Sequence, residues 1–487
     1  MRHSTKLLPG HRTLGLFAGI VAAILIYIFV RPAGLPEAGT MTAAVAALMA
    51  IWWATEAAPV AVTALLPLVL FPSLGVLPIA ETAPSYAHPI IYLFFGGFVI
   101  AIAIERSGLH RRVALKTFKM FGMNGKSLIA GFMAAGAFIS MWISNTSTTL
   151  MLLPIAMSVI VVIRDTIPNL AERERSDFET ALLLGLAYGA TLGGISTLVG
   201  TPPNALMAGF MQSTYNIEID FRKWMLIGVP VSMIMLPLTW LALTRFIFKV
   251  NFRATNEARA QIGIMSGNMS KITQPEIRIA LIFTALVLGW IFRKPLASLT
   301  GMSELTDSGV AMAAAIAAFL IPSGKDGENL MTWEDAKRLP WGVLILFGGG
   351  LALANAMTSS GLTQWIGELL VPLGDVNIII LIIAITAMVI FLTELTSNLA
   401  TTATFLPVMA AIAVETGQDP LVFVIPVTLA ASCAFMLPVA TPPNAIVFSS
   451  GSVSIPRMMR AGIVLNLIGV AVLTVVSLYL APAVFGS

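Results

Sequence analysis

The sequence predicts an all-α polytopic membrane protein, with about eleven transmembrane helices and two re-entrant helical hairpins in an inverted repeat. Of the 487 residues, 57% are hydrophobic and only 11% are charged, whereas soluble proteins carry roughly 25% charged residues. Apolar windows long enough to span a bilayer recur from Thr13 to Val484. Two apolar runs are too long for a single crossing, and several motifs occur twice. These observations predict both the class and its internal symmetry.

The apolar runs define the expected crossings. The first run follows three basic residues but is interpreted as an uncleaved span, because the turn after it, 31–34, has no small-x-small cleavage site. The expected spans are 13–30, 41–54, 57–71, 88–105, 179–213, 224–248, 276–294, 306–322, 340–358, 420–450 and 459–483.

The runs 127–163 and 376–413 are expected to fold back on themselves. As one continuous helix, 127–163 would be about 55 Å long, against a hydrocarbon core of about 30 Å. Each run contains a polar stretch, SNTSTT at 144–149 and SNLATT at 397–402, which is the natural place for the turn. Irregular backbone at membrane depth is tolerated only where it is buried in protein or lines a cavity. The two tips are therefore expected to line a polar cavity.

The distribution of positive charge predicts the orientation. With a cytoplasmic N-terminus, 23 of the 28 Lys and Arg residues fall on the inside and five on the outside, as the positive-inside rule requires. This topology opens the first hairpin to the cytoplasm and the second to the outside, and it leaves the C-terminus outside. The segment 106–121 is amphipathic and basic and is expected to lie along the cytoplasmic interface, with 361–374 as its counterpart.

An internal repeat supports the opposed hairpins. Ser144-Asn145 recurs as Ser397-Asn398 at an offset of 253, and TPPNA at 201–205 recurs at 441–445 at an offset of 240. The glycine pairs 96–97 and 349–350 also match at the first offset. Related halves of opposite orientation are typical of secondary transporters.

The two TPPNA motifs predict broken helices. A proline disfavours helical geometry in the preceding residue and removes a backbone donor, and Thr-Pro suits an N-cap followed by the first helical position. Each break would free carbonyl groups near Gly200 or Ala440 and would point a helix N-terminus into the bilayer. Free carbonyls suit a small cation, whereas a helix N-terminus suits an anion. An ordinary proline kink is the alternative for either motif taken alone.

The polar residues at the tips predict an alkali cation rather than a divalent metal, because a divalent site would be expected to supply carboxylates. Only Glu56, Glu394 and Asp307 are acids expected within the membrane. Glu394 is either a paired or protonated structural group or a part of the coupling site. The single cysteine, Cys433, excludes a disulfide framework and a multi-cysteine metal site. No nucleophile or metal cluster indicates an enzyme.

The paired SNT and SNL tips, together with two TPPN breaks, closely resemble the divalent anion:sodium symporter family of dicarboxylate and citrate carriers. The resemblance implies a homodimer whose transport domain moves like an elevator against a scaffold. The resemblance assigns two segments, 1–126 and 251–375, to the scaffold. It assigns the segments 127–250 and 376–487 to the transport domain, and each of these contains one hairpin and one broken helix. It also implies a sodium-coupled importer of succinate, malate, fumarate or citrate in the bacterial inner membrane, with co-transported sodium as the only cofactor. A sodium-independent exchanger, an anion channel and a membrane-embedded enzyme remain alternatives.

The resemblance assigns the site residues by position. The first sodium site would use Ser140, Ser144, Asn145 and the carbonyl of Gly200, and the second would use Thr393, Thr396, Asn398 and the carbonyl of Ala440. Substrate carboxylates would meet Asn145, Thr146, Thr201, Pro202, Ser397, Asn398, Thr441 and Pro442. Leu399 departs from the family pattern, in which both tips read SNT, and this weakens the inference about which carboxylate is carried.

Overall fold

The computed structural model describes residues 9–29, 35–122, 124–167, 170–253, 255, 257, 271–302, 304–324, 327–370 and 376–486. The turn predicted at 31–34, and with it the missing cleavage site, lies outside these residues, as does most of the polar loop 249–275. Ten helices in the described part are long and apolar enough to cross a membrane. Five shorter apolar helices accompany them. The predicted helical membrane protein is confirmed, and the count of eleven spans stays a prediction.

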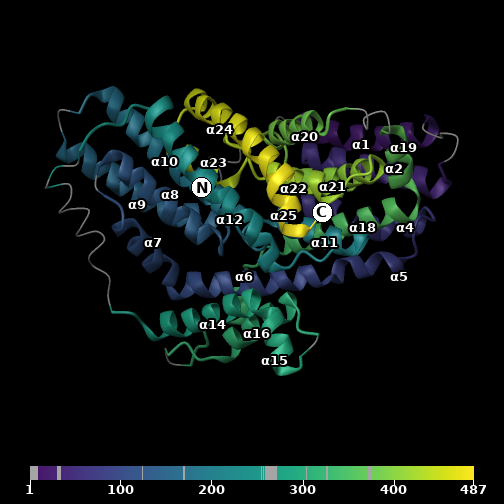
Figure 1. Cartoon of the computed structure of the whole chain (residues 1–487), viewed down its shortest axis with the longest axis horizontal. Coiled ribbons are helices and arrows are strands. Elements are labelled where there is room, and N and C mark those ends of the chain that lie inside the picture. The colour runs from purple at the N-terminus through teal and green to yellow at the C-terminus, as the bar shows by residue number, and fades with distance from the viewer. Residues whose placement is uncertain are drawn as a thin grey trace.

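The first half of the chain alternates long spans with short connecting helices (Figure 1). Its elements are α1 (Pro9–Phe29), α2 (Glu37–Thr55), α3 (Val60–Thr63), α4 (Leu66–Ser73), α5 (Ile79–Thr82), η1 (Ala83–Ala87), α6 (Pro89–Ser107), α7 (Leu109–Lys119), α8 (Gly125–Ser140), α9 (Asn145–Thr166), α10 (Glu172–Ile195), α11 (Pro202–Tyr215), α12 (Phe221–Leu241) and the π-helical η2 (Ala242–Ile247).

The second half repeats the order of elements from α6 to η2 in the stretch 341–480. It comprises α14 (Gln274–Ile291), α15 (Arg293–Thr300), α16 (Asp307–Leu320), α17 (Trp333–Ala336), α18 (Trp341–Ser359), α19 (Leu362–Leu370), α20 (Ile378–Thr393), α21 (Asn398–Glu415), α22 (Leu421–Ala431), α23 (Pro442–Ser449), α24 (Ile455–Val475), the π-helical η4 (Val476–Leu480) and α25 (Ala481–Phe485). Helices α7 and α19 occupy the two segments predicted to be amphipathic counterparts.

Three expected spans are divided in the structure. The run 179–213 becomes α10 and α11, and 420–450 becomes α22 and α23, as the proline breaks predicted. The run 57–71 also divides, into α3 and α4, and this division was not predicted. Pro59 precedes α3 and Pro67 stands in the first turn of α4. Proline is tolerated at such helix starts, where no intrahelical donor is needed.

Helices from both halves of the chain pack together in two sets, which also contact each other, for example through α11 with α18 and α19 with α21. In one set, α6 packs against α14 and α16, while α18 packs against α2, α3 and α4. In the other set, α10 packs against α8, α9 and α12, while α22 packs against α20, α21 and α24. Helix α6 runs across the molecule in Figure 1, with α14 and α16 beneath it. The halves of the chain are therefore interleaved.

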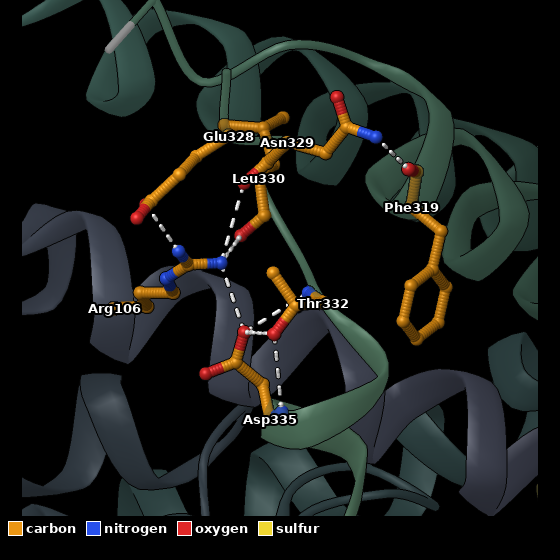
Figure 2. Close-up of polar contacts among 7 residues, drawn as sticks. All are labelled: Arg106, Phe319, Glu328, Asn329, Leu330, Thr332 and Asp335. Carbon is orange, nitrogen blue, oxygen red and sulfur yellow. Dashed lines mark hydrogen bonds and ion pairs between the residues drawn. The ribbon is translucent and has the colours of Figure 1, made fainter. Parts of the chain in front are cut away.

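The corner between α6 and α7 is held by Arg106 (Figure 2). Its guanidinium group donates to Glu328 at 2.6 Å and to Asp335 at 2.8 Å, and it also reaches the carbonyl oxygens of Asn329 and Leu330. Burial disfavours the charged form of Asp335, but hydrogen bonds from Thr332 and the nearby arginines outweigh it and lower the pKa of Asp335. Planar guanidinium groups suit such forked contacts with carboxylates. The loop before α17 is thereby fastened to the last turn of α6.

Candidate functional site

The two hairpin turns lie a few residues earlier than the sequence predicted. Helix α8 ends at Ser140 and α9 begins at Asn145, so the chain turns over 141–144. The stretch at 144–149, expected to be the turn, instead forms the N-cap and first turn of α9, because the hydroxyl of Ser144 accepts a hydrogen bond from the Ser147 amide. The second pair behaves in the same way, with Ser397 as N-cap and α21 beginning at Asn398.

The first tip brings three of its four predicted cation ligands together. The hydroxyl of fully buried Ser140 donates to the amide oxygen of Asn145 at 2.5 Å. A Cβ atom placed on Gly194 would lie 2.5 Å from that oxygen and 3.1 Å from the carbonyl oxygen of Gly200. The tip and the broken helix therefore approach so closely that only glycine fits at position 194. The hydroxyl of Ser144 instead accepts the N-cap hydrogen bond of α9.

The second tip repeats the hydroxyl–amide pair. The Thr393 hydroxyl lies 2.9 Å from the amide oxygen of Asn398 and 2.9 Å from the carbonyl oxygen of Ala431. A hydroxyl has one hydrogen, so it satisfies only one of these two oxygens at a time. Thr396 bonds to Thr401 and to the carbonyl of Leu392 instead. The backbone amide of Ala440 donates a hydrogen bond to the carbonyl oxygen of Leu437.

Two asparagines that the sequence analysis did not identify as functional donate hydrogen bonds to the backbone at the two breaks. Asn204 donates from its side-chain amide to the carbonyls of Gly194 and Thr197, at 3.4 and 2.8 Å. Asn444 donates to the corresponding carbonyls of Ala434 and Leu437, at 3.3 and 3.0 Å, and both asparagines are fully buried. The oxygen of each side chain has no partner in the described structure. The repeated TPPNA motif, in which each is the fourth residue, was the signal that could have identified them.

Glu394 stabilises the second break. Its carboxylate accepts hydrogen bonds from the amides of Phe435, Met436 and Leu437, at 2.7 to 3.1 Å. The side-chain amide of Asn466 donates to it at 2.9 Å, and Glu394 is buried. At the matching position of the first half stands Met141, whose carbonyl oxygen accepts from Thr197. Of the two interpretations of Glu394, these contacts favour a hydrogen-bonded structural group.

The second part of each broken helix packs against the hairpin of the other half. Helix α11 contacts α21 and α22, while α23 contacts α9 and α10. Buried Tyr188 of α10 joins the halves, because its hydroxyl donates to the carbonyl of Phe435 at 2.7 Å. The two tips and the two breaks thus belong to helices that pack against one another across the halves of the chain, and together they make up what we call the polar region.

Four helices in this region begin with a hydroxyl residue at the N-cap: α9, α11, α21 and α23. The side chains of Ser144 and Thr441 accept a bond from their own helix, whereas those of Thr201 and Ser397 do not. A helix N-terminus without such a bond keeps amide donors available to an anion.

The predicted substrate contacts differ in exposure. Asn145, Thr146, Pro202, Ser397 and Asn398 are partly exposed, Pro442 is exposed, and Thr201 and Thr441 are buried. Leu399 is also buried, at 6% exposure, within the hydrophobic core. The position after Asn398 therefore differs from Thr146 in surroundings as well as in chemistry.

The chemistry of this region suits a monovalent cation and an anion. Uncharged hydroxyl, amide and carbonyl oxygens outnumber the hydrogens that could satisfy them, as at Thr393, Asn398 and Ala431. The described residues contain no group of three or more His, Cys, Asp or Glu side chains able to hold a metal ion. Glu56 ends α2, and Asp307 pairs with Arg293 at the start of α16. Glu394 is therefore the only one of the three predicted membrane acids that contacts this region.

Comparisons with known proteins agree with this architecture. Residues 11–485 match the family described as the sodium:sulfate symporter transmembrane region. The chain is 39% identical over 477 residues to proteins named sodium-dependent dicarboxylate transporter SdcS, from Staphylococcus saprophyticus and Staphylococcus aureus. These alignments cover 97% of this chain and 92% of each relative. The crystal structure of the Alcanivorax borkumensis YdaH transporter is similar in fold, with a TM-score of 0.55 at 12% identity, covering 91% of this chain and 98% of that one.

The family match extends over nearly the whole chain and includes both tips and both breaks. It confirms the resemblance inferred from the SN and TPPN motifs, and it makes the protein a transporter rather than an enzyme. The chain is an integral membrane protein that belongs to the divalent anion:sodium symporter family.

Proposed function

We propose that this protein is a secondary active transporter that imports di- or tricarboxylates of the succinate, malate, fumarate and citrate class, coupled to sodium. The observation that carries the proposal is the 39% identity, over 97% of the chain, to sodium-dependent dicarboxylate transporters. The repeated hydroxyl–amide pairs, Ser140 with Asn145 and Thr393 with Asn398, supply the physical basis.

Sodium is expected at two sites related by the repeat. The first uses Ser140, Ser144, Asn145 and the Gly200 carbonyl, and the second uses Thr393, Thr396, Asn398 and the Ala440 carbonyl. Asn145, Asn398 and the hydroxyls of Thr146, Thr201, Ser397 and Thr441 bind the substrate carboxylates, beside Pro202 and Pro442. The first set draws support from the close approach of Asn145, Gly194 and Gly200. The second draws support from the Thr393 hydroxyl, whose single hydrogen lies between the oxygens of Asn398 and Ala431 and can satisfy only one of them.

Coupling to sodium follows from the charge of the substrate. Moving a dianion inward against 100 mV costs about 4.6 kcal/mol, because each charge contributes about 2.3 kcal/mol. Two sodium ions bound with the dianion cancel this cost, and a third makes entry electrically favourable. Cations and an anion bound next to one another at the oxygen-rich tips would each favour binding of the other.

Transport proceeds by movement of a transport part, 127–250 with 376–487, against a scaffold, 1–126 with 251–375. Packing inside each part supports this division, because α6 contacts α14 and α16, whereas α10 contacts α8 and α22 contacts α20. The two parts meet where α11 contacts α18 and where α19 contacts α21. Helices α8 and α20 have 16 residues each, about 24 Å, which is shorter than the hydrocarbon core and suits re-entrant hairpins. The protein functions as a homodimer in the bacterial inner membrane, with the N-terminus inside and the C-terminus outside.

Uptake of radiolabelled succinate into proteoliposomes tests this function. With an inward sodium gradient, uptake should saturate with succinate, rise with sodium, and fall to background when choline replaces sodium. Labelled malate, fumarate and citrate, each measured in the same vesicles, rank the substrates.

Three outcomes would contradict the proposal. Sodium-independent uptake that internal succinate stimulates would identify an exchanger. Flux that does not saturate and is not stimulated from the other side would identify a channel. No sodium-dependent uptake of any of the four acids, by protein that inserts normally, would exclude this substrate class.

A further inference from the structure

A pocket of about 320 Å³ lies between the first turns of α10 and α24, and no residue of either tip lines it. Arg173, Ser176 and Asp177 line it from α10, and Pro456, Arg457 and Arg460 line it from α24. Three arginines against one aspartate give the lining a net charge of +2. Nothing in the transport scheme uses this cationic pocket, and it joins the two halves of the chain.

The three arginines have different roles. Arg457 is held by Ser176 and Asp177, and its guanidinium lies 5.0 Å from the centre of the Phe248 ring. Arg173 and Arg460 are exposed, and neither has an ion-pair or hydrogen-bond partner among the described residues. Arg457 therefore builds the pocket, while Arg173 and Arg460 keep their donors free.

The acids on the same turns of α10 are already engaged. Glu172 pairs with Arg175 at 3.3 Å, and Glu174 accepts from the amide of Asn251 at 2.7 Å. Asp177 accepts from the amide of Lys249 at 3.1 Å, in addition to binding Arg457. Glu179, one turn beyond Ser176, is not part of the lining. The positive charge of Arg173 and Arg460 is consequently left for an external anion.

The position of the pocket indicates what that anion is. Both helices are long apolar spans, so their first turns lie at a membrane–water boundary. The charge distribution assigns 164–175 and 457–460 to the cytoplasmic side, where anionic lipid headgroups are found. Guanidinium groups bind phosphate oxygens in a forked arrangement that lysine cannot reproduce. The geometry points to a binding site for a phosphate group, bridged by Arg173 and Arg460, and supplied by an anionic phospholipid or by soluble phosphate.

Thermal unfolding of the full-length protein in neutral detergent tests this site. The ligands are short-chain phosphatidylglycerol, phosphatidylcholine of the same chain length, and inorganic phosphate at matched ionic strength. Arg173→Gln/Arg460→Gln removes the bridging groups, whereas Arg111→Gln/Lys337→Gln removes two exposed charges outside the pocket. Arg173→Lys/Arg460→Lys keeps the charge and removes the forked geometry.

We expect phosphatidylglycerol to stabilise the unaltered protein and the control alike, and the glutamine pair to bind it roughly 30-fold more weakly. The lysine pair should fall between them. Stabilisation by phosphatidylglycerol but not by inorganic phosphate identifies the lipid as the source, and equal stabilisation by both identifies soluble phosphate. Identical responses of the glutamine pair and the control to every ligand would overturn the site, as would equal stabilisation by phosphatidylcholine.

Discussion

The hydroxyl of Thr393 lies 2.9 Å from the amide oxygen of Asn398, and the same pairing joins Ser140 to Asn145 at the other tip. Each pair connects the last residue of one hairpin helix to the first residue of the next. The two helices of each hairpin are thereby held at the point where a cation is expected to bind. The asparagines consequently link the geometry of the tip to occupancy of the site.

Replacing either asparagine should abolish transport. Asn145→Ala and Asn398→Ala each remove an amide that contacts the hairpin hydroxyl and that is expected to contact cation and carboxylate together. We expect sodium-driven succinate uptake to fall to background while the protein still inserts and purifies. Asn355→Ala, on the exposed face of α18, is the matched control. Near-normal uptake by either tip variant would remove that tip from the site.

The residues after the two asparagines should have different effects. Thr146→Val leaves a carboxylate oxygen without a partner in a water-poor site, which costs roughly 1–3 kcal/mol. We therefore expect about tenfold weaker apparent affinity for succinate. Leu399→Thr should shift the preference between four-carbon dicarboxylates and citrate with little change in sodium activation. Apparent affinities for succinate, citrate and sodium decide both. Altered sodium affinity with an unchanged substrate ranking in Leu399→Thr would contradict the assigned roles.

Glu394 should matter for stability and for sodium together. In Glu394→Gln, one carboxylate oxygen becomes an amide donor that faces the backbone donors of 435–437. We expect a loss of about 2 kcal/mol in unfolding free energy, since bonds to charged groups contribute this much. Apparent sodium affinity should fall more than apparent succinate affinity, because the break borders the proposed second sodium site. Glu368→Gln on exposed α19 is the control, and unchanged sodium activation in Glu394→Gln would limit this residue to folding.

Movement of the transport part can be tested with engineered cysteines in a Cys433→Ala background. A Cβ on Gly350 of α18 would lie 3.5 Å from the Cβ of Ala403 on α21, a distance that suits a disulfide. Oxidised Gly350→Cys/Ala403→Cys should lose transport, regain it on reduction, and crosslink to different extents with and without sodium. The control Ala61→Cys/Gly342→Cys, whose Cβ atoms would lie 3.4 Å apart, joins two scaffold helices and should crosslink without loss of transport. Crosslinking of the first pair that is the same in every condition and leaves transport intact would argue for a fixed pore.

The contact of Arg106 with Asp335 should make the free energy of unfolding depend on pH in the acid range. Because the pKa of Asp335 is lower in the folded protein than in the unfolded chain, its stabilising effect is fully present above the unfolded value, near pH 4. This effect is lost as the pH falls through the folded-state pKa. Asp335→Asn should therefore lower unfolding free energy at pH 7 by about 1 kcal/mol. Melting temperatures of both proteins measured from pH 7 downward should converge below pH 4, and a constant difference would contradict this role.

Several elements of this protein follow from the sequence because their causes are local. The apolar lengths of 88–105 and 340–358 predicted α6 and α18 to within two residues. Thr-Pro at 201–202 and 441–442 predicted the starts of α11 and α23, since proline sets its own backbone angle and removes a donor. The family resemblance assigned Ser140 and Thr393 to the two sodium sites, and each donates to the amide oxygen of the asparagine five residues later.

Other features depend on contacts between residues far apart in the sequence, which no local pattern encodes. The turn at 141–144 is held by Thr197, which follows α10 and donates from its hydroxyl to the carbonyl of Met141, 56 residues away. Glu394 had two interpretations until the amides of 435–437 were found around it, 41 to 43 residues away. The crossed packing of α11 on the second hairpin and α23 on the first likewise arises only in three dimensions. The apolar runs and the prolines of the sequence determine where helices begin and break. Which helix ends contact one another is determined by the need of buried polar groups for hydrogen-bond partners.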